Sequence, residues 1–185
     1  MEGASDRRGR LAEGNAAFRK ATDPALIATL SKGQHPSFAI LTCSDSRVVP
    51  EKLFNLSFGD AFVVRVVGNS AADQSVLGSL EYAVDHLHVR ELLVLGHTGC
   101  GAVRLATEGA NPGNLGPVVR DLERAKSKVP IESENDPDAI AESNVRLQLR
   151  LLEDNSYVIR AAVDKGQLML HGAMYDVRTG AVKFI

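Results

Sequence analysis

The sequence is poor in cysteine, with only two thiols, Cys43 and Cys100, among its 185 residues. So few cysteines cannot build a disulfide framework, and the first thirty residues lack the apolar segment of a secretory signal. We therefore expect reduced, functional thiols in a cytoplasmic protein. The chain also lacks any apolar run close to the roughly 20 residues that a membrane-spanning helix requires, so we expect no membrane association.

An excess of charge of either sign is missing as well. The formal net charge is -2 and the pI is near 6.2, with acidic and basic residues mixed rather than gathered in blocks. This balance gives no basic field for nucleic acid and favours a small soluble substrate. At 44% hydrophobic residues, a chain of 185 residues can bury roughly 70% of its unfolded surface, which predicts a single domain over 1–185.

Apolar runs of strand length alternate with helical patterns, which predicts an α/β fold with a central, mostly parallel sheet flanked by helices. The β-branched run at 61–67 and the apolar runs at 37–42 and 91–96 are typical of buried parallel strands. Asp136 followed by Pro137 is typical of a helix start. The predicted helices span 70–88, 116–128, 136–153 and 156–165, and a last strand at 167–174 is followed by an edge hairpin through 181–185.

The first part of this domain, 1–35, is predicted to be a helical arm that precedes an α/β core over 36–185. Leu11 and Phe18 lie seven positions apart and share one helical face, and a second short helix begins at Asp23. Both helices contain few large apolar residues. They therefore need another surface to pack on.

Two segments concentrate reactive side chains. Cys43, Asp45 and Arg47 alternate just after the first core strand, and His97 and Cys100 lie three positions apart after a later strand. Parallel strands end at one edge of a sheet, where functional groups gather. If the two strands are neighbours, two thiols and an imidazole converge in a set that suits tetrahedral zinc, with the fourth position open to water.

Other interpretations of these residues stay open at this point. The cysteines also fit ordinary buried residues or a disulfide. A phosphatase-like nucleophile is a poorer fit, because three residues between Cys43 and Arg47 are too few for a phosphate cradle and Asp45 would repel phosphate. Asp45 and Arg47 also fit a structural ion pair, which contributes little to stability when exposed. The grouping of all these side chains favours metal ligation.

Taken together, the motifs resemble those of the β-class carbonic anhydrases over nearly the whole chain. The resemblance rests on Cys43-Ser44-Asp45-Ser46-Arg47 and Gly96-His97-Thr98-Gly99-Cys100-Gly101-Ala102, joined by Gly59-Asp60, by Arg65 with Gly68-Asn69, by 78–83 and by 172–176. It implies that Cys43, His97 and Cys100 bind zinc and that Asp45 and Arg47 form a catalytic pair beside the metal. It also implies a homodimer or a dimer of dimers, formed through the N-terminal helices.

The function implied by this resemblance is zinc-dependent, reversible hydration of carbon dioxide (CO2) to bicarbonate and a proton. Asp45, kept ionised by paired hydrogen bonds from Arg47, would accept a hydrogen bond from the activated water and orient it. Gly101 would let the backbone approach the substrate closely, which makes it a candidate substrate-binding residue. Two alternatives stay open: a hydrolase of CS2 or COS on the same fold, and a noncatalytic homologue that zinc stabilises.

Overall fold

The computed structural model describes residues 4–109 and 112–185 and divides into two compact units, Met1–Gln34 and His35–Ile185. The first unit contains the helices α1 (Ala4–Ala21) and α2 (Pro24–Leu30). Asp23 caps α2, because its carboxylate accepts a hydrogen bond from the Ala25 amide at 2.8 Å. None of the residues of α2 is buried, so its apolar side chains have surface left to bury.

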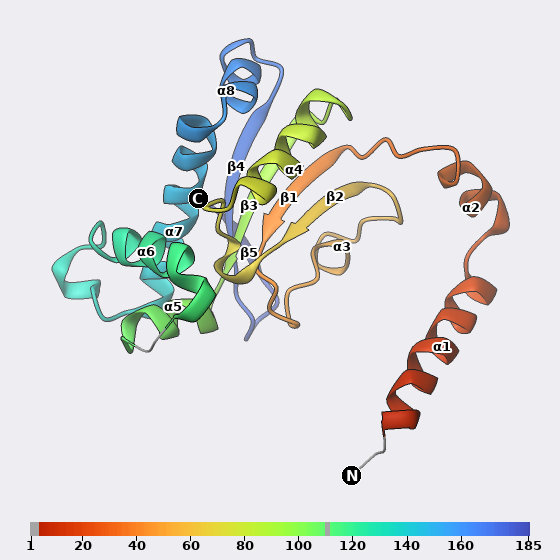
Figure 1. Ribbon diagram of the computed structural model, residues 1–185, viewed down its shortest axis with the longest axis horizontal. Coiled ribbons are helices and arrows are strands. Elements are labelled where there is room, and N and C mark those ends of the chain that lie inside the picture. The colour runs from red at the N-terminus through yellow and green to blue at the C-terminus, as the bar shows by residue number, and fades with distance from the viewer. Residues whose placement is uncertain (1–3, 110–111) are drawn as a thin grey trace. The chain divides into compact units, whose positions relative to one another are not determined.

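A five-stranded sheet forms the centre of the second unit, with the strand order β2-β1-β3-β4-β5 (Figure 1). The strands are β1 (Phe38–Thr42), β2 (Ala61–Arg65), β3 (Glu91–His97), β4 (Met169–Tyr175) and β5 (Val182–Phe184). The first four are parallel, and β5 pairs antiparallel with β4 at the edge. The predicted α/β class and edge hairpin are confirmed. Because β1 and β3 are neighbouring parallel strands, both reactive segments begin at the same C-terminal end of the sheet.

Six helices of this unit are α3 (Pro50–Leu53), α4 (Gln74–Asp85), α5 (Gly101–Thr107), α6 (Gly116–Lys126), α7 (Pro137–Asn155) and α8 (Tyr157–Asp164). Short 3-10 turns lie between these elements, at Val67–Asn69, Gly113–Leu115 and Ile131–Ser133. The turns and α3 were not predicted, because so few residues show no periodicity. None of the helices in the described ranges combines the length and apolarity needed to cross a membrane.

The segment between β2 and α4 differs from the prediction. The strand expected over 61–67 ends at Arg65, and the helix expected from residue 70 begins at Gln74 with Asp73 as its cap. Between them the backbone turns back, with Gly68 at a φ of 68° and Asn69 at 44°. Residues in this left-handed region cannot continue a strand or a helix. The predicted loop at 111–116 falls partly outside the described residues.

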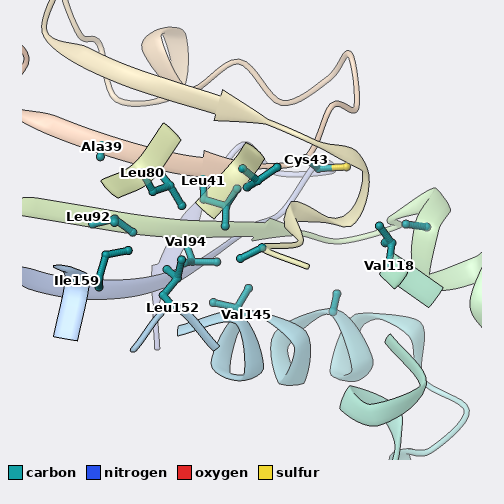
Figure 2. Close-up of a cluster of buried hydrophobic side chains, with 14 of the residues drawn as sticks. Ala39, Leu41, Cys43, Leu80, Leu92, Val94, Val118, Val145, Leu152 and Ile159 are labelled. Carbon is teal, nitrogen blue, oxygen red and sulfur yellow. The ribbon is translucent and has the colours of Figure 1, made fainter. Parts of the chain in front are cut away.

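Most of the core lies on one face of the sheet, beneath α4, α7 and α8 (Figure 2). Side chains from β1, β3, α4, α7 and α8 interlock there, among them Leu41, Leu92, Val94, Leu80, Val145, Leu152 and Ile159. On the other face, a smaller cluster around Ile40, Leu93 and Leu95 packs against residues in and after α3. The ends of β1 and β3, where the reactive residues begin, are therefore held by packing on both faces.

Candidate metal centre

Three of the predicted site residues come from the ends of the adjacent strands β1 and β3. Cys43 directly follows β1, His97 is the last residue of β3, and Cys100 is the N-cap of α5. The buried hydroxyl of Thr42 donates to the carbonyl oxygen of Leu95 at 3.0 Å, which ties the two strand ends together. The labelled Cys43 in Figure 2 lies at this end of the sheet.

The side chains of Cys43, His97 and Cys100 converge in a buried cluster. Their potential ligand atoms all lie within 4.8 Å of one another, and all three residues are buried. No other group of three potential metal-binding side chains is found in the described part of the chain. The structure therefore brings the Cys43 thiol together with an imidazole and a second thiol that lie 54 and 57 positions further along the sequence.

The orientation of His97 fits a bound metal ion. Its Nδ1 lies 3.0 Å from the carbonyl oxygen of Thr98, so Nδ1 carries the proton and donates it to that oxygen. Nε2, the other ring nitrogen, is buried and has no hydrogen-bond partner among the described residues. Leaving a buried nitrogen unpaired costs about 1–3 kcal/mol. A cation held between this nitrogen and the two sulfurs would satisfy it.

The two thiols differ in acidity because they share a hydrogen bond. Contact with Cys100, with His97 and with the backbone amides of Asp45 and Gly68 lowers the pKa of Cys43 to about 4, although burial opposes this. The same contact raises the pKa of Cys100, and burial adds to the effect. The cluster alone thus holds one thiolate readily. A divalent cation supplies the charge needed to ionise the second thiol.

Asp45 and Arg47 form a bidentate ion pair beside this cluster. Arg47 donates from Nε to Oδ1 of Asp45 at 3.0 Å and from Nη2 to Oδ2 at 2.7 Å. These side-chain hydrogen bonds hold the pKa of Asp45 well below its usual range, so the carboxylate is ionised at neutral pH. Oδ2 also lies 4.0 Å from Nε2 of His97, which places the carboxylate next to the proposed ligands.

Further residues that sequence reasoning did not assign to the site fix this pair from outside. Arg65, at the end of β2, donates to the carbonyl oxygen of Asp45 at 2.8 Å. Arg47 also donates to the carbonyl oxygen of Gly99 at 3.2 Å, and the Gly99 amide donates to Asp138 at 2.8 Å. Arg65 is part of the motif that contains Gly68-Asn69, but the sequence assigned it no function. No sequence pattern indicated a role for Asp138. Both contacts depend on strands and helices that meet only in the folded chain.

Gly101, the predicted substrate-binding residue, is the exposed first residue of α5. A methyl group added at this position would meet no described atom within 4 Å. No protein neighbour therefore requires glycine here, and contact with substrate stays a prediction. Gly99 differs, because its φ of 62° strains any larger residue.

The sequence matches a known protein family over most of its length. The profile of the family described as "Carbonic anhydrase" matches residues 38–182, which include strands β1 to β4 and every predicted site residue. The protein named carbonic anhydrase 2 of Mycobacterium tuberculosis is 38% identical over 158 residues, which are 83% of this chain and 76% of that protein.

Solved structures with the same fold extend the similarity beyond the sheet. A β-carbonic anhydrase of Aspergillus fumigatus superposes with a TM-score of 0.87 at 32% identity, over 97% of this chain and 90% of that chain. Tetrameric β-carbonic anhydrases of Sordaria macrospora give a TM-score of 0.85 at 26% identity, over 98% of this chain and 97% of that chain. These matches include the N-terminal unit as well as the α/β unit.

Proposed function

Because this chain belongs to the β-class carbonic anhydrase family, we infer that it is a lyase that catalyses the reversible hydration of CO2 to bicarbonate and a proton. The observation that carries this inference is the buried cluster of Cys43, His97 and Cys100, in which Nε2 of His97 has no hydrogen-bond partner among the described residues. Three protein ligands leave one tetrahedral position open, as catalytic zinc sites do and closed structural sites do not.

Zinc is the metal that this proposal assigns to the cluster, since two thiolates and an imidazole are soft and borderline ligands that suit Zn²⁺. When bound, zinc supplies the Lewis acid that activates water for attack on CO2. The carbonyl oxygen of Thr98 accepts the Nδ1 proton of His97 and so keeps Nε2 directed at the ion. Contacts with Cys100 and His97 lower the pKa of Cys43 and so favour its thiolate form.

Asp45 and Arg47 are the catalytic residues of this proposal. The ionised carboxylate of Asp45 lies beside the ligand atoms, where it would accept a hydrogen bond from the activated water and orient that water toward CO2. Arg47 fixes the plane of the carboxylate through two parallel hydrogen bonds. We assign the substrate contact to Gly101 because its backbone follows the ligand Cys100 directly.

The first test is loss of one ligand. Cys43→Ala should reduce bound zinc to background and abolish CO2 hydration together, because the remaining thiol and imidazole cannot complete the site. Metal analysis and stopped-flow hydration measure both quantities, and circular dichroism verifies folding. Ser44→Ala, at the exposed neighbouring position, is the control and should retain zinc and activity.

Two outcomes would contradict the proposal. Hydration by zinc-free Cys43→Ala would show that the cluster is not the catalytic centre. A wild-type protein with a full complement of zinc but no hydration at any pH would exclude carbonic anhydrase activity. Turnover of CS2 or COS would then identify a hydrolase on this fold, and turnover of neither would leave a noncatalytic zinc protein.

We also propose a cytoplasmic homodimer or dimer of dimers. The cytoplasm keeps thiols reduced, as their ligation to zinc requires. Support for the assembly comes from the N-terminal unit, where Leu11 is 77% exposed and no residue of α2 is buried. Such apolar side chains gain stability by packing on a partner. The tetrameric relatives of Sordaria macrospora fit this assignment.

A further inference from the structure

The peptide between Thr98 and Gly99 connects the proposed histidine ligand to a carboxylate of α7. Its carbonyl oxygen accepts a hydrogen bond from Nδ1 of His97 at 3.0 Å. The N–H group of the same peptide donates to Oδ1 of Asp138 at 2.8 Å. Because the C=O and N–H of a trans peptide point in opposite directions, one rigid planar group lies between the imidazole and the carboxylate.

The local backbone leaves the orientation of this peptide to its partners. Residues 98 and 99 form a turn in which Gly99 has a φ of 62°. Glycine adopts positive and negative φ with similar ease, so the central peptide of such a turn can rotate and carry its carbonyl oxygen to the other side. The preceding peptide is held separately, because the Thr98 amide donates to the carbonyl oxygen of Tyr175 in β4 at 2.9 Å. Asp138 holds the Thr98–Gly99 peptide from outside the turn.

Two local roles of Asp138 do not account for this contact. Asp138 lies in the first turn of α7, where a negative charge stabilises a helix. Its Oδ2 lies 3.9 Å from Nη2 of Arg178, but both side chains are partly exposed, so this ion pair contributes little. Neither role requires Oδ1 to face an amide 39 positions away in the sequence. The contact instead joins the start of α7 to the turn between two proposed metal ligands.

We propose that Asp138 is a positioning residue that acts on His97 through the Thr98–Gly99 peptide. A carboxylate that accepts from the N–H group makes the carbonyl oxygen of the same peptide more negative, and hydrogen bonds in such a chain strengthen one another. The oxygen then holds Nδ1 of His97 more firmly and keeps Nε2 directed at the metal, as a direct carboxylate partner does in other metal sites. The inference rests on the proposed function only in taking His97 as a metal ligand.

Zinc affinity and a cobalt spectrum report this chain of contacts independently of catalysis. Asp138→Ala removes the acceptor for the Gly99 amide and leaves every proposed ligand in place. Zinc affinity of the full chain, measured by competition with a chelator, should fall about tenfold, the lower end of the range for losing a partner of a metal-binding histidine. The visible absorption bands of the cobalt-substituted protein depend on ligand geometry. They should shift, because the imidazole of His97 is held less firmly.

Asp138→Asn separates the hydrogen bond from the charge, because its amide oxygen can still accept from Gly99. A neutral hydrogen bond is roughly half as strong as a charged one, so zinc affinity should stay within about threefold of the wild type, with the wild-type cobalt spectrum. Both variants remove the negative charge from the first turn of α7, so a loss of helix stability would affect them alike. Arg178→Gln removes the ion pair but not the Gly99 contact. It is the matched control and should keep both quantities.

The outcomes separate this inference from the proposed function. If Asp138→Ala keeps the wild-type spectrum and a zinc affinity within about twofold, or if Asp138→Asn loses as much affinity as Asp138→Ala, the inference is wrong. If Asp138→Ala does not fold, Asp138→Ser decides alone, because its hydroxyl supports a helix start but is too short to reach the Gly99 amide. If affinity and spectra change as expected but the zinc-loaded wild type hydrates no CO2, the positioning role stands and the proposed function fails.

Discussion

Asp45 is held from several directions at the candidate site. Arg47 contacts its carboxylate with the guanidinium and, at 2.9 Å, with the backbone amide, while Arg65 holds its carbonyl oxygen. A second pair of the same local form, Asp176 with Arg178, lies at the end of β4. An Asp-x-Arg pair is thus a stable local structure in itself. Its position beside His97 is what gives the Asp45 pair a chemical role.

Replacement of either Asp45 or Arg47 should lower the rate of catalysis and leave metal binding unchanged. Asp45→Asn removes the charged hydrogen-bond acceptor and should lower kcat by about 100-fold, as the loss of one oriented polar contact in an active site does, while zinc content stays complete. Arg47→Gln leaves the carboxylate but frees its orientation, so it should lower kcat by a smaller factor. Stopped-flow hydration and metal analysis measure these effects.

Arg178→Gln is the matched control for the loss of an Asp-x-Arg ion pair and should keep kcat within about twofold. A fully active Asp45→Asn enzyme would refute the catalytic assignment. Equal losses in Arg178→Gln and Arg47→Gln would instead indicate a general effect of removing arginine from this edge of the sheet.

At the scale of elements, close packing between α7 and the sheet determines where His97 lies. Gly96 immediately precedes this histidine in β3, and a β-carbon there would lie 2.5 Å from a methyl of Val145 and 2.8 Å from the sulfur of Met174. Gly172, in the adjacent strand β4, faces Val145 at a similarly short 3.1 Å. The two glycines let α7 approach the strands closely, and the same helix supplies Asp138.

Gly96→Ala should therefore disturb both the fold and the metal site. The added methyl group forces Val145 or the strand to move, at a cost of about 1–3 kcal/mol in the free energy of unfolding. Because the displacement occurs next to His97, zinc affinity should fall as well. Chemical denaturation and chelator competition measure the two effects.

Gly78→Ala is the control for this substitution. Gly78 lies inside α4, and a β-carbon there would meet nothing within 4 Å in the part of the chain that the structure describes. Alanine favours a helix interior over glycine by about 1 kcal/mol, so this variant should be neutral or more stable. If Gly96→Ala matched it in stability and in zinc affinity, the close approach of α7 would not position the ligand.

At the scale of the whole molecule, the chain combines an α/β unit that contains every proposed site residue with a helical unit that contains none of them. All proposed metal ligands lie at or just after the C-terminal ends of the adjacent parallel strands β1 and β3. The helical unit exposes apolar side chains, among them Leu11, Leu26 and Ile27. We therefore expect the helical unit to contribute to the assembly of subunits and not to the reaction itself.

Removal of residues 1–34 tests that contribution. Sedimentation of the full chain should give the mass of a dimer or tetramer, and the truncated chain should give a smaller assembly, because the helices that pack on a partner are gone. Zinc should remain bound, since Cys43, His97 and Cys100 all lie in the second unit. A monomeric full chain, or an unchanged mass after truncation, would contradict the proposed role of the arm.

The main elements of the fold and the identity of the reactive residues could be predicted from the sequence. Periodicity located the strands and long helices to within a few residues, because each buries a repeating apolar pattern. Cys43 and His97 were placed at strand ends, and the pairing of β1 with β3 confirmed that both leave the sheet at one edge. Periodicity failed at 66–73, where left-handed backbone at Gly68 and Asn69 ends the strand early.

The sequence by itself determined which residue types are available for chemistry: two thiols, an imidazole and an Asp-x-Arg pair, each next to a strand. Only the tertiary structure decided which partners hold them, from the Arg65 contact with Asp45 to the Asp138 contact with Gly99. Hydrogen bonds between residues tens of positions apart have no local pattern along the chain. They arise where the packing of strands and helices brings a donor and an acceptor within 3 Å, and that packing is a property of the whole core.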